Sequence, residues 1–238
     1  MRDLTGVLRL GGKELKTPAV CGSVMGSTVE EMVRGRRRAE RMGADLVELR
    51  LDGLKEEPDW ERLLGGGLPI ILTCRSRREG GLFRGREEER VERLLEGMER
   101  DVPCLDLEFS TPSPLLGEVV SQAKKKGTSI LLSHHELAGT PPLPSLLRMA
   151  RRMEKVGDLV KVVTFARETE EVIRVLEFLH RARLSVPLIS FAMGEVGTLS
   201  RILSALLGSP LVYASVGRPT APGQLDVKTT KRLLEMMV

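Results

Sequence analysis

The chain has 238 residues, of which 41% are hydrophobic, and it carries a formal net charge of +4. Its length fits one large α/β domain or two small ones, and no run approaches the roughly eighteen consecutive apolar residues of a membrane-spanning helix. Residues 1–16, MRDLTGVLRLGGKELK, lack the apolar stretch of a signal peptide. We therefore expect a soluble, cytoplasmic protein with no membrane partner.

The predicted strands come in chain order after a short hairpin. GVLRLGGKELK (6–16) is typical of a β-hairpin that turns at Gly11-Gly12. Eight short apolar runs follow, and we predict that each is a strand: TPAVCGSVM (17–25), ADLVELRLD (44–52), LPIILTCRS (68–76), VPCLDLEF (102–109), TSILLSHH (128–135), DLVKVVTF (158–165), VPLISFAM (186–193) and SPLVYASV (209–216).

Amphipathic stretches separate these strands. The basic run RGRRRAER (34–41) has apolar neighbours at helical spacing, which predicts the solvated face of a helix. Four further apolar stripes predict helices: Val91, Leu94, Leu95 and Met98; Val172, Leu176 and Leu179; Leu199, Ile202, Leu203 and Leu206; Thr230, Leu233, Leu234 and Met237. Gly43, Gly127 and Gly157 are expected to end helices as C-caps.

Near-continuous apolar strands alternating with helices indicate a parallel sheet that is covered on both faces. Eight such units predict a (β/α)8 TIM barrel that spans residues 1–238 as one domain, with the hairpin covering the bottom of the barrel. A doubly wound open sheet is the alternative, but the sequence has no GxGxxG after the first strand and no GxxxxGK[ST]. We see no linker.

Ionisable residues gather at one end of the predicted barrel, the carboxyl ends of the strands, where barrel active sites lie. Each has an ordinary structural explanation when it is taken alone. Their convergence at the ends of successive strands favours a site over coincidence. The residues are Glu48, Arg50 and Asp52; Arg75; Asp106 and Glu108; His134 and His135; and Lys161.

The composition of this site limits its chemistry. His134 and His135 are adjacent in a strand, so their side chains face opposite sides and cannot share a metal as neighbours. The sequence has no GxSxG serine motif, and its three cysteines form no CxxC, which favours reduced thiols. We therefore expect no metal site.

Lys161 is the unusual residue, because it interrupts the apolar run of its strand. An isolated strand lysine commonly extends its amine to the surface. In this setting, however, an apolar wall and the nearby charge of Arg75 would disfavour the ammonium form. A neutral amine can attack a carbonyl carbon, so the position favours a Schiff-base lysine with a neighbouring acid–base histidine.

At this point the sequence resembles the type I 3-dehydroquinate dehydratase family of the shikimate pathway in aromatic amino acid biosynthesis. The resemblance runs through most of the chain and is carried by GSVMGST (22–28), ELRLD (48–52), CRSRREGG (74–81), DLEF (106–109), LLSHHE (131–136), LVKVV (159–163), GTLSR (197–201) and TAPGQ (220–224). It implies a barrel lyase that converts 3-dehydroquinate to 3-dehydroshikimate and water without metal or cofactor, often as a homodimer.

The resemblance also implies roles for individual residues. Lys161 would form the Schiff base, His135 would be the general acid and base, and Glu79 would orient His135. The substrate-binding positions would be Glu48 and Arg50 for hydroxyl groups, Arg201 for the carboxylate, Gln224 in a lid, and Arg75, Thr220, Ser23 and Met193 around them.

Some positions depart from the family pattern or have no assigned role. Glu136 and Leu137 stand where an aspartate or asparagine and then an aromatic residue are common, and Thr220 replaces a serine but keeps its hydroxyl. We expect His134 to face the helical layer and His180 to lie on the surface. Asp106 shares a face with Glu108 and is expected behind the residues that contact substrate.

Two other functions remain open at the level of sequence. A class I aldolase-type barrel would use the same lysine chemistry on another small keto acid or sugar, but it would not explain RSRREGG, GTLSR and TAPGQ together. A nucleic-acid or other anion-binding protein would use the basic surface, but with only 3% aromatic residues the chain has little to stack on bases.

Overall fold

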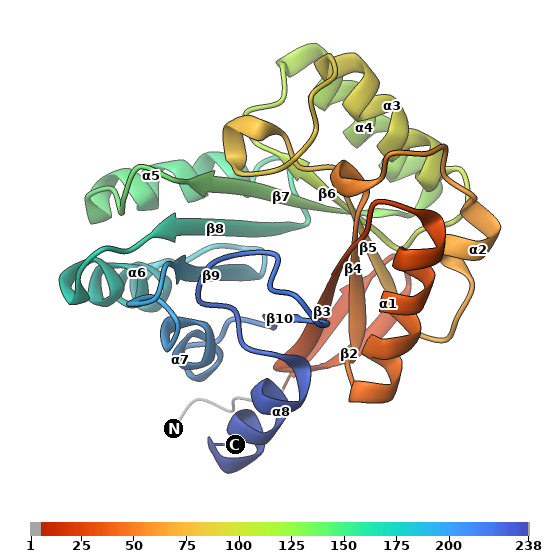
Figure 1. Cartoon of the computed structure of the whole chain (residues 1–238). Helices are drawn as coiled ribbons and strands as arrows, with labels where there is room; N and C mark the ends of the chain where they lie inside the picture. The colour runs from red at the N-terminus through yellow and green to blue at the C-terminus, as the bar shows by residue number, and fades with distance from the viewer. Residues whose placement is uncertain (1–5, 238) are drawn as a thin grey trace.

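In the computed structural model, which describes residues 6–237, eight parallel strands form a nearly closed barrel with helices around it (Figure 1). Each strand coincides with one predicted apolar run, so the TIM-barrel prediction is confirmed. The hydrogen-bonded order begins at β10 and ends at β9, and no ladder joins these two strands within residues 6–237. The strands are β3 (Ala19–Met25), β4 (Leu46–Arg50), β5 (Ile70–Thr73), β6 (Cys104–Glu108), β7 (Ser129–Glu136), β8 (Leu159–Phe165), β9 (Leu188–Met193) and β10 (Leu211–Ser215).

The helices alternate with these strands. They are α1 (Val29–Met42), α2 (Trp60–Leu64), α3 (Glu87–Met98), α4 (Ser113–Lys126), α5 (Leu143–Met153), α6 (Thr169–Arg181), α7 (Ser200–Leu206) and α8 (Val227–Met237), with 3-10 turns η1 (Leu51–Gly53) and η2 (Arg77–Glu79). Gly43 and Gly127 end α1 and α4 in the left-handed conformation, as predicted.

Two predictions at helix ends are wrong. Leu199 was placed on a buried stripe, but α7 begins only at Ser200, so Leu199 is its N-cap and is 65% exposed. Gly157 does not cap α5, whose C-cap is Glu154. A glycine is needed at 157 for another reason, because a Cβ there would lie 2.7 Å from the Cβ of Leu132.

Alternation along the strands sorts their side chains into two apolar layers. On β8, Val160 and Val162 belong to the outer layer beneath the helices, whereas Leu159 and Val163 belong to the inner layer inside the barrel. Lys161 lies between Leu159 and Val163 in this alternation and therefore points inward, as predicted.

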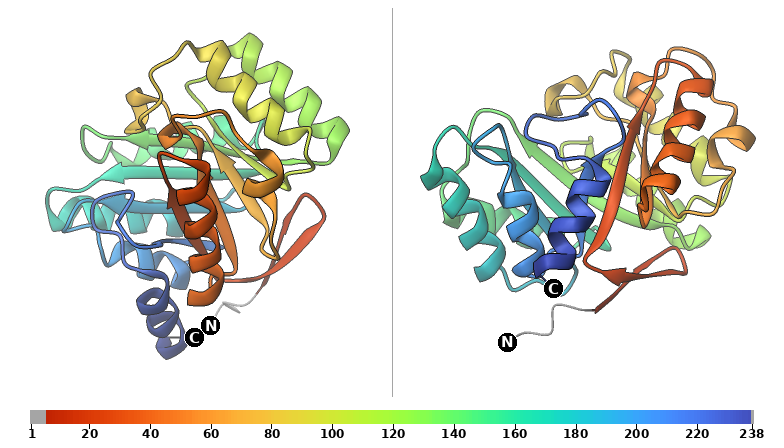
Figure 2. Two further views of the ribbon diagram at one scale, coloured as in Figure 1. Left: turned by 45° about the vertical axis from the view of Figure 1, so that its right-hand side comes forward. Right: turned by 60° about the horizontal axis from the view of Figure 1, so that its bottom comes forward.

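The hairpin of β1 (Gly6–Leu10) and β2 (Lys13–Thr17) closes the bottom of the barrel, as predicted (Figure 2, right). Leu8, Leu10 and Leu15 join the inner apolar layer. The turn is docked by a hydrogen bond of 3.0 Å from the Gly11 backbone N–H to Ser129 Oγ. Gly11 has a φ of +48°, and a Cβ there would lie 2.5 Å from the Pro103 carbonyl oxygen, so this turn requires glycine. The hairpin thus covers the amino ends of the strands and leaves their carboxyl ends open.

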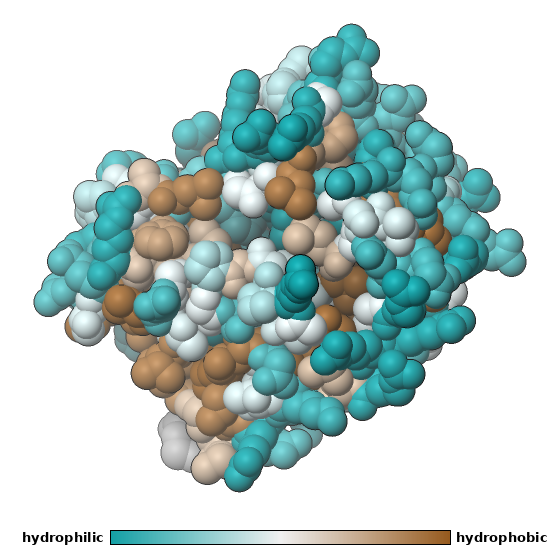
Figure 3. Space-filling view, viewed as in Figure 1, coloured by the Kyte–Doolittle hydropathy of each residue, from teal (hydrophilic) through white to brown (hydrophobic). Residues whose placement is uncertain are grey.

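The surface around α1 is strongly hydrophilic, and apolar residues gather instead around α7 (Figure 3). The prediction of a solvated basic face holds for Arg34, Arg37, Arg38 and Arg41, which are exposed. Arg36 is the exception, since it is buried on α1 and pairs with the half-buried Glu40. Within residues 6–237 no helix has the length and apolar character needed to cross a membrane.

Candidate active site

A cavity of about 290 Å³ opens at the carboxyl ends of the barrel strands. All eleven residues to which the resemblance gives a catalytic or substrate-binding role line it: Ser23, Glu48, Arg50, Arg75, Glu79, His135, Lys161, Met193, Arg201, Thr220 and Gln224. A larger hollow of about 950 Å³ lies beside α3 and contains none of them. The charged residues that line this hollow are of both signs. Because none of the eleven residues lies there, we take the smaller cavity as the candidate active site.

Lys161 extends into this cavity from the middle of β8 and is 3% exposed. Its Nζ donates a hydrogen bond of 2.6 Å to Asp106 Oδ2 and lies 3.8 Å from Glu48 Oε1. Below it the ring of Tyr213 lies 4.4 Å from Nζ. The prediction of an apolar wall around the amine is therefore wrong. Two carboxylates and an aromatic face surround it, which is the pairing that a buried cation requires.

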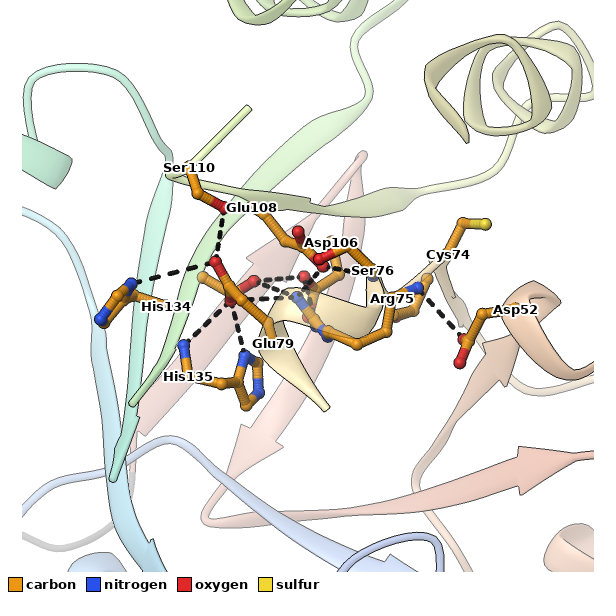
Figure 4. A network of polar contacts seen from close by, with 12 residues as sticks. Asp52, Cys74, Arg75, Ser76, Glu79, Asp106, Glu108, Ser110, His134 and His135 are labelled. Carbon is orange, nitrogen blue, oxygen red and sulfur yellow. Dashed lines mark hydrogen bonds and ion pairs between the residues drawn. The ribbon is translucent and has the colours of Figure 1, made fainter. Parts of the chain in front are cut away.

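Arg75 follows β5 and joins three carboxylates behind the cavity (Figure 4). Its guanidinium lies 2.7 Å from Asp106 Oδ1, 3.3 Å from Glu108 Oε1 and 3.8 Å from Glu79 Oε2. Burial alone would lower the pKa of Arg75, but these carboxylates outweigh it and raise that pKa. Arg75 is therefore a fixed positive charge at the centre of the buried network.

Asp106 links Arg75 to Lys161. Burial would raise its pKa, but the charges of Arg75 and Lys161 hold the pKa of Asp106 well below the ordinary carboxyl value. Asp106 does not line the cavity, in agreement with its predicted place behind the substrate contacts. What the sequence did not indicate is its direct contact with the Lys161 amine.

His135 lies near the end of β7, with its ring against Glu79. Glu79 Oε2 accepts the His135 backbone N–H at 2.9 Å and lies 3.1 Å from Nδ1, while Oε1 accepts the Ser110 hydroxyl at 2.7 Å. Burial lowers the pKa of His135 well below its ordinary value, and the charges of Arg75 and Lys161 lower it further. Burial also raises the pKa of Glu79 to about 7.

These contacts fix the orientation of the imidazole. Above its pKa of about 7 Glu79 is a carboxylate, and a carboxylate at 3.1 Å from Nδ1 places the ring proton of His135 on that nitrogen. Nε2 then carries a free lone pair, so it can accept a proton from a bound molecule.

His134 does not line the cavity, in keeping with its position next to His135 on the strand. Its Nδ1 nevertheless lies 3.9 Å from Glu79 Oε1, so the two histidines flank one carboxylate (Figure 4). No group of three or more histidine, cysteine or acidic side chains is placed to hold a metal within the described part of the chain. His180 is exposed on α6, as predicted.

Glu48 begins a chain of hydrogen bonds that reaches the loop after β10. It accepts the Ser23 hydroxyl at 2.6 Å and the Thr73 hydroxyl at 3.0 Å. The Thr220 hydroxyl lies 3.1 Å from Ser23 Oγ and 3.1 Å from Gln224 Oε1. The loop of residues 217–224 is thereby attached to the wall of the cavity.

Arg50 and Asp52 form a bidentate pair, with both hydrogen bonds at 2.8 Å. The prediction that Asp52 continues the strand is wrong, because β4 ends at Arg50 and Asp52 lies in η1. From this turn Asp52 accepts the backbone N–H groups of Arg75 and Leu82 at 3.1 and 3.0 Å. It holds the segment after β5 in place and leaves the guanidinium of Arg50 facing the cavity.

Arg201, in the first turn of α7, is 2% exposed and has no carboxylate within salt-bridge distance among the described residues. Its guanidinium stacks over Phe191 at 4.4 Å and donates to the Pro222 carbonyl at 3.1 Å. Its Nε has no hydrogen-bond partner within residues 6–237. Burial lowers the pKa of Arg201 to about 10, because nothing nearby compensates its charge. An anion in the cavity would supply that compensation.

Sequence reasoning missed several residues that line the cavity. Phe165, Phe191 and Tyr213 form much of its apolar surface. Strand parity could have indicated Tyr213, because it alternates with the inward Leu211 on β10. The same parity could have indicated Ser133, which alternates with Leu131 and His135 on β7 and whose hydroxyl contacts both Arg75 and Asp106 behind the cavity.

A family model for type I 3-dehydroquinase matches residues 20–238. The chain belongs to this family. It is 34% identical over 218 residues to the 3-dehydroquinate dehydratase of Methanothermobacter thermautotrophicus, a match that covers 90% of this chain and 95% of that one. It is 35% identical over 224 residues to the enzyme of the same name from Methanopyrus kandleri, with 92% and 99% covered. The crystal structure of 3-dehydroquinate dehydratase from Geobacillus kaustophilus superposes with a TM-score of 0.89 at 27% identity, covering 98% and 97%.

Proposed function

We propose that the protein is a 3-dehydroquinate dehydratase that removes water from 3-dehydroquinate through a Schiff base on Lys161. Membership in the type I 3-dehydroquinase family supports the activity. The observation that carries the mechanism is that the Lys161 amine and the His135 imidazole line one cavity with Arg201, which has no carboxylate partner among the described residues.

The lysine step forms a carbon–nitrogen bond. The Lys161 ammonium gives a proton to a base such as His135, and the Nζ lone pair then attacks the ketone carbon. That proton and one remaining N–H proton are transferred to the carbonyl oxygen, which leaves as water. The product is an iminium, which carries the one positive charge that the ammonium carried before. The iminium acidifies the adjacent C–H bond, because the electrons of that bond can flow to the cationic nitrogen.

His135 then moves the proton. Nε2 accepts it from the carbon beside the iminium, which gives a neutral enamine and an imidazolium whose Nδ1–H faces Glu79 at 3.1 Å. The same imidazolium protonates the β-hydroxyl, which leaves as water while the enamine electrons form the new double bond. The conjugated iminium is then hydrolysed, and Lys161 is regenerated.

The remaining residues hold the substrate. Arg201 suits the substrate carboxylate, since a guanidinium fork matches a carboxylate and this one lacks an internal partner. Glu48 and Arg50 would bind ring hydroxyls, and the loop that carries Thr220 and Gln224 lines the same cavity. Ser23, Arg75 and Met193 complete the wall.

Borohydride reduction tests this proposal. The protein is incubated with 3-dehydroquinate and reduced, and its peptides are analysed by mass spectrometry. We expect a stable adduct on Lys161, and none with the Lys161→Arg variant, which keeps the positive charge beside Asp106 but has no primary amine. Absence of an adduct, or an adduct on another lysine, would overturn the mechanism.

The role of His135 is tested separately with His135→Ala. A general base contributes roughly 10²- to 10⁴-fold to a proton-transfer step, so the elimination rate should fall by about that factor. The variant should still form the reducible adduct on Lys161, since the amine and its carboxylate partners are unchanged. An equal loss of imine formation and of elimination would contradict the assignment of His135 as the base.

A further inference from the structure

Asp106 occupies a place that the steps above do not use. It is 1% exposed, and its Oδ2 lies 2.6 Å from the Nζ of Lys161, the atom that would become the iminium nitrogen. Its other oxygen, Oδ1, accepts the Ser133 hydroxyl at 2.6 Å and lies 2.7 Å from Arg75 Nη2. The carboxylate is thus fixed on one side and presents a single oxygen to the lysine.

We propose that Asp106 is the counter-ion of the iminium on Lys161 and keeps the nitrogen protonated through the reaction. This inference rests on the proposed Schiff-base function. Conversion of the ammonium to the iminium leaves one positive charge and at least one N–H on the nitrogen, so Oδ2 keeps both its hydrogen bond and its charge partner. Without a protonated nitrogen, the electrons of the broken C–H bond would have no cationic acceptor.

Two neighbours keep Asp106 from accepting the proton of the iminium nitrogen. Arg75 and the Ser133 hydroxyl both occupy Oδ1, which stabilises the negative charge of the carboxylate. The depressed pKa of Asp106 has the same cause. Asp106 therefore accepts a hydrogen bond from the nitrogen but is a poor base toward it.

Other charged or titratable groups face the amine from the surrounding elements. Cys21 on β3 and Cys104 on β6 lie near it, and the groups that share its cavity are Glu48 and Arg50 on β4, Arg75 after β5, Glu79 on η2, His135 on β7, Arg201 on α7 and Tyr213 on β10. Glu48 is the only other carboxylate within 4 Å of Nζ in the described part of the chain, at 3.8 Å, and it already accepts two hydroxyl groups. Asp106 is therefore the closer partner of the nitrogen.

The pH dependence of kcat tests the role of the counter-ion, because kcat reports ionisations in the enzyme-bound state. Asp106→Asn keeps the size and an oxygen acceptor but removes the charge. An opposite charge at this distance shifts a pKa by about 1–3 units, so the alkaline limb of the kcat profile should move down by about 1–3 pH units. If Asp106 only stabilised the fold, the substitution would lower kcat and leave the alkaline limb at the wild-type pH.

Glu108→Gln is the matched control. Glu108 is equally buried and also pairs with Arg75, but it does not contact Lys161. The alkaline limb of the kcat profile of Glu108→Gln should stay at the wild-type pH. An unmoved limb in Asp106→Asn, or an equal movement in both variants, would overturn the assignment.

A second measurement uses the wild-type protein and does not depend on the folding of the variant. With a ¹³C label at the ketone carbon, the chemical shift of the bound substrate distinguishes iminium from neutral imine. The bound species should deprotonate at a higher pH than the imine of the same ketone with a free lysine side chain, and an equal or lower pH would overturn the inference. Failure of the proposed function would show differently, as a wild-type protein without turnover or without the borohydride adduct.

Discussion

Buried positive charges on the two sides of the cavity have different partners. On the side of β4 to β8, Arg75 and Lys161 are each held by carboxylates at 2.6–2.7 Å. On the side of β9, α7 and the loop after β10, Arg201 stacks on Phe191 and bonds only to a backbone carbonyl among the described residues. Accordingly the pKa of Arg75 is raised by its carboxylates, whereas burial lowers that of Arg201 to about 10.

This difference separates a preformed part of the site, whose buried charges are paired, from a part whose buried charge lacks a partner until a ligand binds. A buried charge costs free energy unless it is paired, and the first side meets that requirement internally. The second side does not, so an anionic ligand would bring the missing partner. The Schiff-base lysine and the carboxylate clamp that we propose therefore lie on different walls of one cavity.

The largest expected effect is on stability. Arg75→Met would leave Asp106, Glu108 and Glu79 without their common cation, and breaking a buried pair in this way costs about 3–5 kcal/mol. Arg201→Met removes a charge that has no internal partner, so the free energy of unfolding should not fall. Urea denaturation of both variants measures this contrast. An equal loss in the two proteins would show that the walls do not differ as described.

The next effect concerns ligand binding at the Arg201 wall. Hydrogen bonds to charged groups contribute about 1.5–3 kcal/mol, so Arg201→Met should weaken binding of a substrate-like cyclohexane carboxylate by roughly 10- to 150-fold. Titration calorimetry gives the two dissociation constants. The same ligand with a carboxamide in place of the carboxylate is the control and should lose little further affinity on mutation. Equal weakening of both ligands would argue against a carboxylate clamp.

A smaller effect is expected in the acid stability of the preformed wall. The folded-state pKa of Asp106 lies below its unfolded value of about 3.9. Its contribution is therefore fully present above pH 4 and is lost as the pH falls toward the folded-state pKa. The stability difference between wild type and Asp106→Asn should shrink by about 1 kcal/mol between pH 5 and pH 3. A difference that stays constant with pH would contradict the depressed pKa.

The barrel was predictable because each strand is a continuous apolar run, and alternation alone placed Lys161 inside. Helix ends were less predictable, since a stripe that includes Leu199 does not reveal where α7 begins. The partner of Lys161 could not be found from sequence. In the strand register, Lys161 on β8 lies opposite Ser133 on β7, and Ser133 lies opposite Glu108 on β6. The Lys161 amine nevertheless contacts Asp106, which is two residues before Glu108. That offset depends on how the strands are staggered around the barrel, which parity does not encode.

The smallest expected effect concerns the loop that joins the two walls. The Thr220 hydroxyl bridges Ser23, which donates to Glu48 on the preformed wall, and Gln224 in the loop. Thr220→Val keeps the shape but removes this link, at a cost of about 0.5–1 kcal/mol. KM should rise roughly 2- to 5-fold, while the free energy of unfolding stays near that of the wild type, because Thr220 is only half-buried and belongs to neither apolar layer. Thr220→Ser retains the hydroxyl and should keep the wild-type KM. If serine raised KM as much as valine does, the methyl contact of Thr220 would be what positions the loop, and the hydroxyl chain would not join the two walls.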